Sequence, residues 1–454
     1  MAVFPRSPPR NLWQTNRTLR QMAEFNRPET PQDFIRNFAP KKPLMNSSEA
    51  YYESARCLYC YDAPCMDACP THIDIPLFIK QINTGNIKGA AATIYDSNWL
   101  GNACGKVCPT EQLCEGSCVY THQDMKPLQI GRLQNFATEA AMQAGSPLFS
   151  PGKDNGRKVA IVGAGPAGIA CACELRVLGY SVEIFEAKAL PTGLTVYGTA
   201  PYKITNEEAL RENEYLQNQL GYTIHYNHPI QNAAQFAELE QDFDAVFLGL
   251  GLGATARLGI PGEDMPGVVG AVEFVEELRM KQSGYSIPDT VVVIGGGNTA
   301  VDAASESARM GASSVHLVYR RTKADMGAYD FEYATALGAG VKGVFEASPV
   351  RIEGEGRATG VTFARPDGTE FHVPAQLVIK GTGQAKQGEL LKHLPNISTD
   401  SKGRIVVDEA FQTTRPGYFA AGDAINGGAE VVNAAYEGKC AAQGMHQWIQ
   451  TNKA

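Results

Sequence analysis

Cysteine thiols are the most concentrated chemically active groups in this sequence. Of the 11 cysteines, eight fall between Cys57 and Cys118. Four of them crowd into a first run that ends in Cys-Pro, namely Cys57, Cys60, Cys65 and Cys69. A second run contains Cys104, Cys108, Cys114 and Cys118. Clustered cysteines in a long chain without an export signal bind metal more often than they form disulfides.

Two kinds of metal site compete for these thiols. Zinc sites usually hold two closely spaced cysteine pairs separated by a longer spacer. A tight run of four cysteines before a proline is typical of ferredoxins, in which the last cysteine binds the other of two clusters. The spacing therefore favours iron–sulfur over zinc, and the eight cysteines predict two [4Fe–4S] clusters.

Two glycine-rich loops could each hold a dinucleotide. The first follows the expected strand 158–162 and opens a helix, with Gly163, Gly165, Pro166, Ala167 and Gly168. Its glycines allow a pyrophosphate to approach the N-terminus of the helix, so the loop predicts a dinucleotide-binding fold. Glu186 ends the next strand and is expected to accept hydrogen bonds from the adenosine ribose.

The second loop follows the expected strand 290–294 and contains Gly295, Gly297, Asn298 and Thr299. The strand after it ends in Arg320 and Arg321, with no acid where Glu186 stands in the first fold. A carboxylate would repel a 2′-phosphate, whereas arginine binds one. The two arginines thus favour NADP(H) over NAD(H), and the alternative is that both are solvated charges at a strand end.

A third motif indicates which of the two folds binds FAD. Residues 414–423 form a short apolar strand that ends in Gly422 and Asp423, and a helix is expected from Val431 to Trp448. This pattern resembles the second flavin motif of reductases with two dinucleotide domains. The resemblance implies that Asp423 meets the ribityl chain, and that the helix beginning with Val431 and Val432 points its N-terminus at the flavin.

The elements that must position these groups fall into four parts of an α/β chain. Residues 1–150 should form a helical domain around two clusters, because residues 75–97 and 130–143 repeat apolar side chains at helical spacing. Residues 151–255 and 384–454 would be two parts of a Rossmann-like FAD domain. A second Rossmann-like domain, residues 256–383, would bind NAD(P)H as an insertion between them.

Composition excludes several classes of protein. Forty basic residues against 48 acidic ones give a net charge of −8, which argues against nucleic acid or an anionic membrane as the main partner. The sequence contains no apolar run long enough for a transmembrane helix. Its first 20 residues lack the apolar core of a secretory signal, so the cytoplasm is the expected compartment.

Over residues 45–454 the chain resembles the small subunit of glutamate synthase and, more closely, the N-terminal half of dihydropyrimidine dehydrogenase and its separate bacterial counterpart. The runs 56–70, 104–114 and 130–139 carry this resemblance. It implies that one cluster is bound by Cys57, Cys60, Cys65 and Cys118, and the other by Cys69, Cys108, Cys114 and Gln134. Counting cysteines alone would choose Cys104 in place of Gln134, and the sequence leaves this choice open.

The expected flavin loop departs from the family pattern at two places. Thr192-Gly193 replaces the usual Gly-Gly before Leu194, and Lys203 stands where many relatives have arginine. A positive charge is retained, but the forked geometry of arginine is lost. Leu194 and Lys203 are still expected to contact FAD.

The resemblance implies an NAD(P)H-dependent flavoprotein iron–sulfur oxidoreductase. Hydride would pass from NAD(P)H to FAD, and electrons would leave singly through two clusters, so no side chain of the protein is required as a catalytic acid or base. The partner would be an FMN subunit with its own clusters that reduces uracil or thymine in a hetero-oligomer. The alternatives are the glutamate synthase small subunit and, less favoured, a non-catalytic electron-wiring scaffold.

Overall fold

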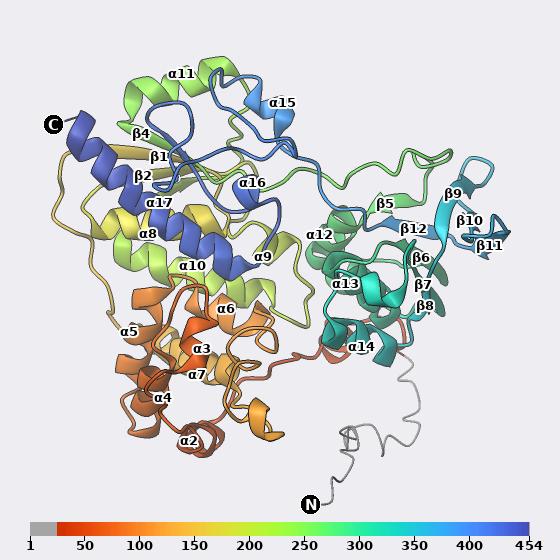
Figure 1. Ribbon diagram of the computed structural model, residues 1–454, viewed down its shortest axis with the longest axis horizontal. Helices are drawn as coiled ribbons and strands as arrows, with labels where there is room; N and C mark the ends of the chain where they lie inside the picture. The colour runs from red at the N-terminus through yellow and green to blue at the C-terminus, as the bar shows by residue number, and fades with distance from the viewer. Residues whose placement is uncertain (1–24, 454) are drawn as a thin grey trace, which may run out of the picture. The chain divides into compact units, whose positions relative to one another are not determined.

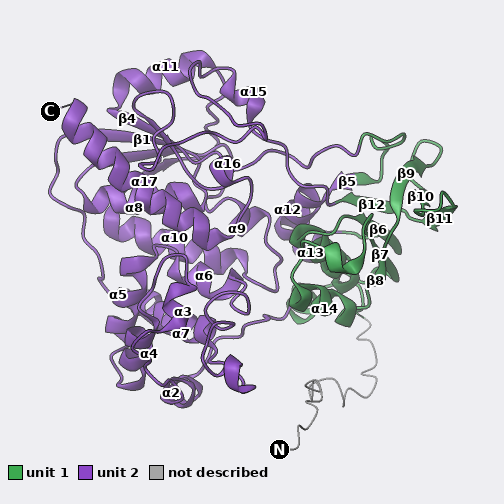
Figure 2. Cartoon of the chain, viewed as in Figure 1, with its two compact units in different colours: residues 1–37, 259–268, 286–380 green, residues 38–258, 269–285, 381–454 purple. Residues whose placement is uncertain are grey.

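The structure, a computed structural model, describes residues 25–453 of the chain (Figure 1). Residues 1–24, where no secretory signal is expected, lie outside the described residues. The chain divides into two compact units (Figure 2), the larger of which comprises residues 38–258, 269–285 and those from 381 onward. The smaller unit comprises the described residues up to 37, then 259–268 and 286–380. The expected boundary near residue 150 stays a prediction, since the larger unit spans it.

The cysteine-bearing segment of the larger unit is helical, as its apolar spacing predicts. It contains α2 (Ser47–Ala55), α3 (Pro64–Asp67), α4 (Ile75–Asn83), α5 (Ile87–Ser97), α6 (Gly101–Val107), η2 (Thr121–Gln123) and α7 (Ile130–Gln143). Residues 75–97 form two helices because Gly85 adopts a left-handed conformation and Asn86 caps the second helix by accepting a hydrogen bond from Gly89. The apolar face of α4 is buried as predicted, through Ile75, Phe78, Ile79 and Ile82.

A five-stranded parallel sheet carries the first glycine-rich loop. Its strand order is β13-β4-β1-β2-β3, with β1 (Lys158–Val162), β2 (Ser181–Phe185), β3 (Thr223–His225), β4 (Ala245–Leu248) and β13 (Tyr418–Ala420). The C-terminal strand β13 pairs in parallel with β4, where Phe419 lies opposite Phe247. The C-terminal part of the chain therefore completes the first dinucleotide fold, as the sequence predicts.

The longest helix of the larger unit packs along the helix that follows the first loop (Figure 1). These are α17 (Val431–Asn452) and α8 (Pro166–Val177). They approach closely at Gly438, where an added Cβ would lie 2.2 Å from the Ala167 carbonyl oxygen. Cys171 and Cys173 on α8 are fully buried, whereas Cys440 on α17 is partly exposed. The remaining elements are α9 (Leu194–Tyr197), α10 (Asn206–Leu220), α11 (Ala233–Asp242), α12 (Ala271–Lys281), η3 (Gln282–Gly284), α15 (Gly388–Leu391) and α16 (Asp423–Asn426).

The smaller unit holds most of a second five-stranded sheet, of order β5-β12-β6-β7-β8. Its strands are β5 (Val268–Gly270), β6 (Thr290–Ile294), β7 (Ser314–Val318), β8 (Lys342–Val344) and β12 (Leu377–Lys380). Strands β12, β6, β7 and β8 pair in parallel, and β6 runs into the second glycine-rich loop. The unit also contains α1 (Pro31–Asn37), α13 (Asn298–Arg309), η4 (Lys323–Asp325) and α14 (Asp330–Gly338).

A three-stranded antiparallel sheet in the smaller unit was not expected from the sequence. It consists of β9 (Ser348–Glu353), β10 (Gly360–Ala364) and β11 (Glu370–Pro374). The middle strand β10 buries side chains on both faces, including Thr362, and its register with β9 shifts at Thr362 and Phe363. This burial on both faces removes the polar–apolar alternation that identifies a half-buried strand.

None of the helices in residues 25–453 is long and apolar enough to cross a membrane.

Candidate functional site

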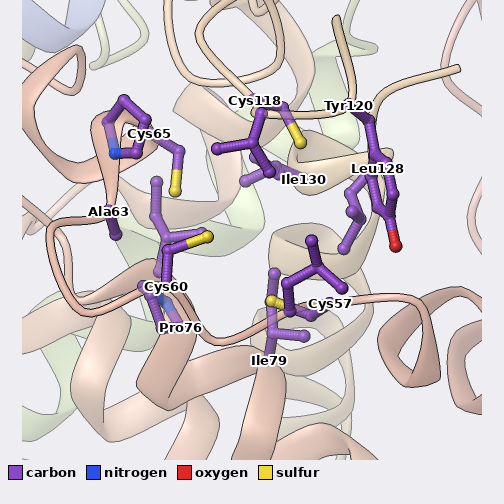
Figure 3. Close-up of a pocket in the computed structure, with 14 residues that line it drawn as sticks. Cys57, Cys60, Ala63, Cys65, Pro76, Ile79, Cys118, Tyr120, Leu128 and Ile130 are labelled. Atoms are coloured by element: carbon purple, nitrogen blue, oxygen red, sulfur yellow. The ribbon is translucent and has the colours of Figure 1, made fainter. Parts of the chain in front are cut away.

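Four cysteine thiols from distant parts of the sequence surround one cavity in the helical segment (Figure 3). Cys57, Cys60 and Cys65 come from the first run, and Cys118 is the last cysteine of the second run. Apolar side chains such as Leu128 complete the wall. Within residues 25–453 no three Cys, His, Asp or Glu side chains converge tightly enough for a single metal ion, and these four thiols frame a wider space.

The thiols of this first cavity act on one another electrostatically. Burial raises the pKa of Cys57, and the charges of Cys60 and Cys118 add to that effect. Burial also raises the pKa of Cys65 to about 12, and the charges of Cys57, Cys118 and Cys60 add to that effect. Thiolate is the form of cysteine that binds metal, so metal binding at these thiols is accompanied by release of protons. Four sulfur donors around one apolar cavity fit a [4Fe–4S] cluster.

A second cavity shares a wall with the first, because Ile75 lines both. The potential metal ligands around it are Cys69, Cys104, Cys108, Cys114 and Gln134. Cys69 belongs to the first run by sequence but lines the second cavity, whereas Cys118 belongs to the second run and lines the first. The structure thus groups the eight cysteines by cavity and not by their order in the sequence.

Gln134 and Cys104 both line the second cavity, but their polar groups are engaged differently. The Gln134 side chain is buried, and its Nε2 donates a hydrogen bond of 2.5 Å to the Gly101 carbonyl. The amide carbonyl oxygen is then the atom of this side chain that can bind a metal. The pKa of Cys108 is held well above its usual range, first by a hydrogen bond with Cys104 and then by burial. Cys104 therefore contacts a predicted ligand, and the assignment of Gln134 stays a prediction.

One cation beside the second cavity was missed by the sequence analysis. Lys42 donates a hydrogen bond of 2.9 Å from Nζ to the Cys108 carbonyl oxygen. Burial raises the pKa of Cys114, the charge of Glu115 adds to the effect, and the charge of Lys42 opposes it. Lys42 lies outside both cysteine runs, so only the tertiary fold reveals its position.

The first glycine-rich loop leaves an open space at the N-terminus of α8. Gly163 has a φ of +101°, and a Cβ there would lie 2.4 Å from the Gly249 carbonyl oxygen. A Cβ on Gly168 would lie 2.0 Å from the Gly163 carbonyl oxygen, so the helix packs directly on the loop. A Cβ on Gly165 would meet no atom within 4 Å. This open approach, just before Pro166 and Ala167 begin the helix, fits a pyrophosphate.

Glu186 lies beside this loop, as its predicted role requires. Its buried carboxylate accepts hydrogen bonds from the backbone nitrogens of Ala164, at 2.7 Å, and Lys188, at 2.8 Å. A carboxylate oxygen has a second lone pair for another donor. The expected contact with a ribose therefore stays compatible with these bonds, and it stays a prediction.

Two buried hydroxyl groups next to the loop have no hydrogen-bond partner, those of Thr192 and Thr195. Gly193 lies between them against Gly165, since a Cβ on Gly193 would be 3.0 Å from the Gly165 Cα. A buried hydroxyl without a partner costs about 1–3 kcal/mol, so these two hydroxyls suit polar contacts with a bound ligand. The loop that begins α9 at Leu194 thus fits a bound dinucleotide, and Thr195 is a candidate contact that the sequence analysis did not name.

The second flavin motif meets the first loop. Gly422 lies against Ala167 of α8, and its backbone nitrogen donates a hydrogen bond of 2.7 Å to Glu437. Burial raises the pKa of both Asp423 and Glu437. Glu437 was missed because it lies within α17, where its spacing is that of an ordinary helical residue. At the start of the same helix, Val432 lines the second cavity.

Lys203 occupies a turn after Ala200 and is partly exposed. The turn is held by Arg279 of α12, a fully buried arginine that donates hydrogen bonds to the Ile204 carbonyl at 3.0 Å and to Asn206 at 2.8 Å. The predicted contact of Lys203 with a flavin stays a prediction.

The second glycine-rich loop is also open toward solvent. A Cβ on Gly297 would meet nothing within 4 Å, and Thr299 next to it is exposed. Asn298 begins α13 and accepts a hydrogen bond of 2.9 Å from the Tyr329 backbone nitrogen. Arg320 and Arg321 follow β7 and are both exposed. The smaller unit therefore offers an open glycine loop after β6 and two cations after the neighbouring strand β7, which fits a phosphorylated dinucleotide.

Comparisons with known proteins agree with this set of sites. Residues 34–146 match the family described as dihydropyrimidine dehydrogenase domain II, 4Fe-4S cluster, and residues 157–438 match the pyridine nucleotide-disulphide oxidoreductases. The glutamate synthase [NADPH] small chain of Escherichia coli K12 is 34% identical, over 92% of this chain and 98% of its own length. The NAD-dependent dihydropyrimidine dehydrogenase subunit PreT of the same organism is 35% identical, over 90% of this chain and 96% of its own length. The chain therefore belongs to the pyridine nucleotide-disulphide oxidoreductases, in the same family as these two relatives.

Membership of this family confirms the expected α/β fold and the expected class of enzyme, an oxidoreductase. The chain is an oxidoreductase with a 4Fe–4S segment followed by an FAD- and NAD(P)-binding α/β fold. FprA of Mycobacterium tuberculosis, solved in complex with NADPH, has the same α/β fold, with a TM-score of 0.55 and 20% identity over 65% of this chain and 85% of FprA. One of the two relatives is named as a small chain and the other as a subunit.

Proposed function

We propose that this chain is the electron-input subunit of a dihydropyrimidine dehydrogenase. It oxidises NAD(P)H through FAD and delivers electrons through two [4Fe–4S] clusters to a partner subunit, which holds FMN and reduces uracil or thymine. The observation that carries the proposal is the division of eight cysteines between two adjoining cavities in a chain with two dinucleotide folds. The relative named as a dihydropyrimidine dehydrogenase subunit supports the choice of partner and substrate.

The side chains between the sites favour an order for electron transfer. Val432 belongs both to the wall of the second cavity and to the first turn of the helix that follows the second flavin motif. Ile75 belongs to the walls of both cavities. Bound FAD supplies the conversion from two-electron to one-electron chemistry. Through Val432 and Ile75 the flavin motif, the second cavity and the first cavity follow one another in series. We therefore propose that electrons leave toward the partner from the first cavity.

The final substrate depends on the branch of the family. By resemblance, Gln134 favours the dihydropyrimidine branch, because most glutamate synthase relatives carry glutamate there. The second candidate is the small subunit of glutamate synthase, and the relative of that name is similar to nearly the same degree. In either case we propose a cytoplasmic hetero-oligomer in which this chain accepts the reducing equivalents.

The test is to express the chain anaerobically with each candidate partner and to follow coenzyme oxidation. With an FMN subunit the complex should consume uracil, whereas this chain alone should reduce only artificial dyes. Oxidation that requires a large amidotransferase subunit, glutamine and 2-oxoglutarate would assign the second candidate. A flavin-loaded chain that reduces no dye with either coenzyme would favour the non-catalytic scaffold and contradict both.

Gln134 should matter more than Cys104 for iron content. The Gln134→Ala variant should lose about four of about eight iron atoms per chain, because an amide oxygen at the second cavity is removed. The Cys104→Ala variant should keep both clusters, and Gln134→Glu should keep them too, since glutamate also offers an oxygen. Iron and sulfide analysis of the three anaerobically purified variants decides the ligand. Loss of a cluster in Cys104→Ala with full iron in Gln134→Ala would show that Cys104 is the ligand.

A further inference from the structure

A strap of chain, residues 38–43, connects the turn that carries Lys203 to the second cavity. At one end the Phe38 ring stacks on Tyr202, with centroids 6.5 Å apart, and the Lys41 backbone nitrogen donates a hydrogen bond of 2.8 Å to the Tyr202 carbonyl. At the other end Arg132 donates a hydrogen bond of 2.7 Å to the Pro43 carbonyl. The side chain between these two anchors is Lys42.

The ammonium group of Lys42 is held against the crossing of α6 and α7. It donates its hydrogen bond to the carbonyl oxygen of Cys108, the C-cap residue that follows α6. A Cβ on Gly131 of α7 would lie 2.6 Å from the Gly105 carbonyl oxygen of α6 and 3.5 Å from Lys42 Nζ. Two glycines therefore let the helices approach closely and leave room for a cation beside the cavity.

The charges that interact with Lys42 line the second cavity or, in the case of Glu115, follow directly after its lining residue Cys114. Glu115 is mostly buried, accepts a hydrogen bond of 3.0 Å from the Gly131 nitrogen, and lies in the field of Lys42. The thiols of Cys108 and Cys114 lie in the same field. A positive charge at this place lowers the energy of added negative charge in the cavity. Lys42 is partly buried, so water screens this effect less than it would for a fully exposed charge.

We propose that Lys42 is a positioning residue that raises the reduction potential of the cluster bound by Cys69, Cys108 and Cys114. This inference rests on the proposed function, because it requires a cluster in the second cavity. A cluster held there by Cys69, Cys108 and Cys114 would gain one electron delivered from the flavin side, with no bond formed or broken. Net charge and hydrogen bonding around a cluster are the terms through which a protein sets its potential.

The test compares three variants of the full chain, Lys42→Met, Lys42→Arg and Lys88→Gln, in a dithionite redox titration followed by electron paramagnetic resonance. Methionine keeps the length of the side chain and removes the charge, whereas arginine keeps the charge. Lys88 is an exposed residue of α5 outside both cavities and serves as the control for loss of a surface charge. In Lys42→Met, reduction of one cluster should become at least about tenfold less favourable, which is a fall of about 59 mV for one electron.

The other cluster is an internal control and should keep its potential in all three variants. Lys42→Arg and Lys88→Gln should titrate like the unmodified protein. Unchanged potentials in Lys42→Met with full iron content would overturn the inference and leave the proposed function intact. Loss of iron in both Lys42→Met and Lys42→Arg would show that the residue only packs the strap, which also overturns it. Loss of iron in Lys42→Met alone would show that the charge is needed to hold the cluster, which would overturn a role limited to its potential. Absence of iron from the unmodified protein would overturn the proposed function itself.

Discussion

Replacing Cys57 and Cys118 together with alanine should remove about four of about eight iron atoms per chain, the same loss as either single replacement causes. The reason is that both thiols line the first cavity, so the second replacement removes a ligand of a cluster that is already lost. Replacing both Cys57 and Cys69 with alanine should remove nearly all iron, because these two cysteines belong to the same run in the sequence but line different cavities. Iron and sulfide analysis of anaerobically purified variants measures both results.

A grouping of the cysteines by sequence order predicts the reverse pattern. Cys57 and Cys69 would then share a cluster and their joint loss would cost half of the iron, whereas Cys57 and Cys118 would belong to different clusters. The matched control is Cys440→Ala, because Cys440 is a partly exposed cysteine on α17 that lines neither cavity. Full flavin content in each variant shows that the dinucleotide folds are intact, so a change in iron reports the clusters.

The double variant Arg320→Ala, Arg321→Ala should lose its preference for NADPH. Both arginines are exposed just after β7, next to the open glycine loop that follows β6. A charge-assisted bond to a phosphate is worth roughly 1.5–3 kcal/mol, or about 10- to 150-fold in affinity. The Michaelis constant for NADPH in dye reduction should therefore rise by at least about tenfold, while that for NADH changes little.

Arg321 also has a local partner that competes with this role. Asp325 has a lowered pKa, first through hydrogen bonds from Thr322 and also through the charge of Arg321. The variant Arg320→Lys, Arg321→Lys keeps both charges and loses the forked geometry of the guanidinium groups. Its Michaelis constant for NADPH should therefore lie between those of the unmodified protein and the alanine variant. An unchanged ratio of the two Michaelis constants in the alanine variant would mean that the arginines are solvated charges and do not contact the 2′-phosphate.

The strand–loop–helix units could be predicted from the sequence because their signals are local. A run of apolar residues, a glycine-rich loop and a helix follow one another within about 20 residues at β1 and again at β6. The helix α7 has the predicted bounds for the same reason. The antiparallel strands β9 to β11 escaped notice because the middle strand is buried on both faces and so lacks a period of two.

The site was predictable where a residue type is rare and was missed where it is common. Cysteines are conspicuous in a sequence, and the two cavities are lined by those that the resemblance implies. Lys42 and Glu437 are ordinary residues that the fold brings to Cys108 and Gly422, and Thr195 is an ordinary residue marked only by its buried, unpartnered hydroxyl. Periodicity and spacing contain no information about such contacts, so only the tertiary structure brings these residues to the sites.

The most direct test of the account is a count of cofactors in the full chain after anaerobic purification. We predict about eight iron atoms, about eight inorganic sulfides and about one FAD per chain, with almost no zinc, because two cavities are each lined by the ligands of one [4Fe–4S] cluster. Iron and sulfide near zero with zinc in their place would contradict the account, and so would a chain that retains both clusters but binds no FAD.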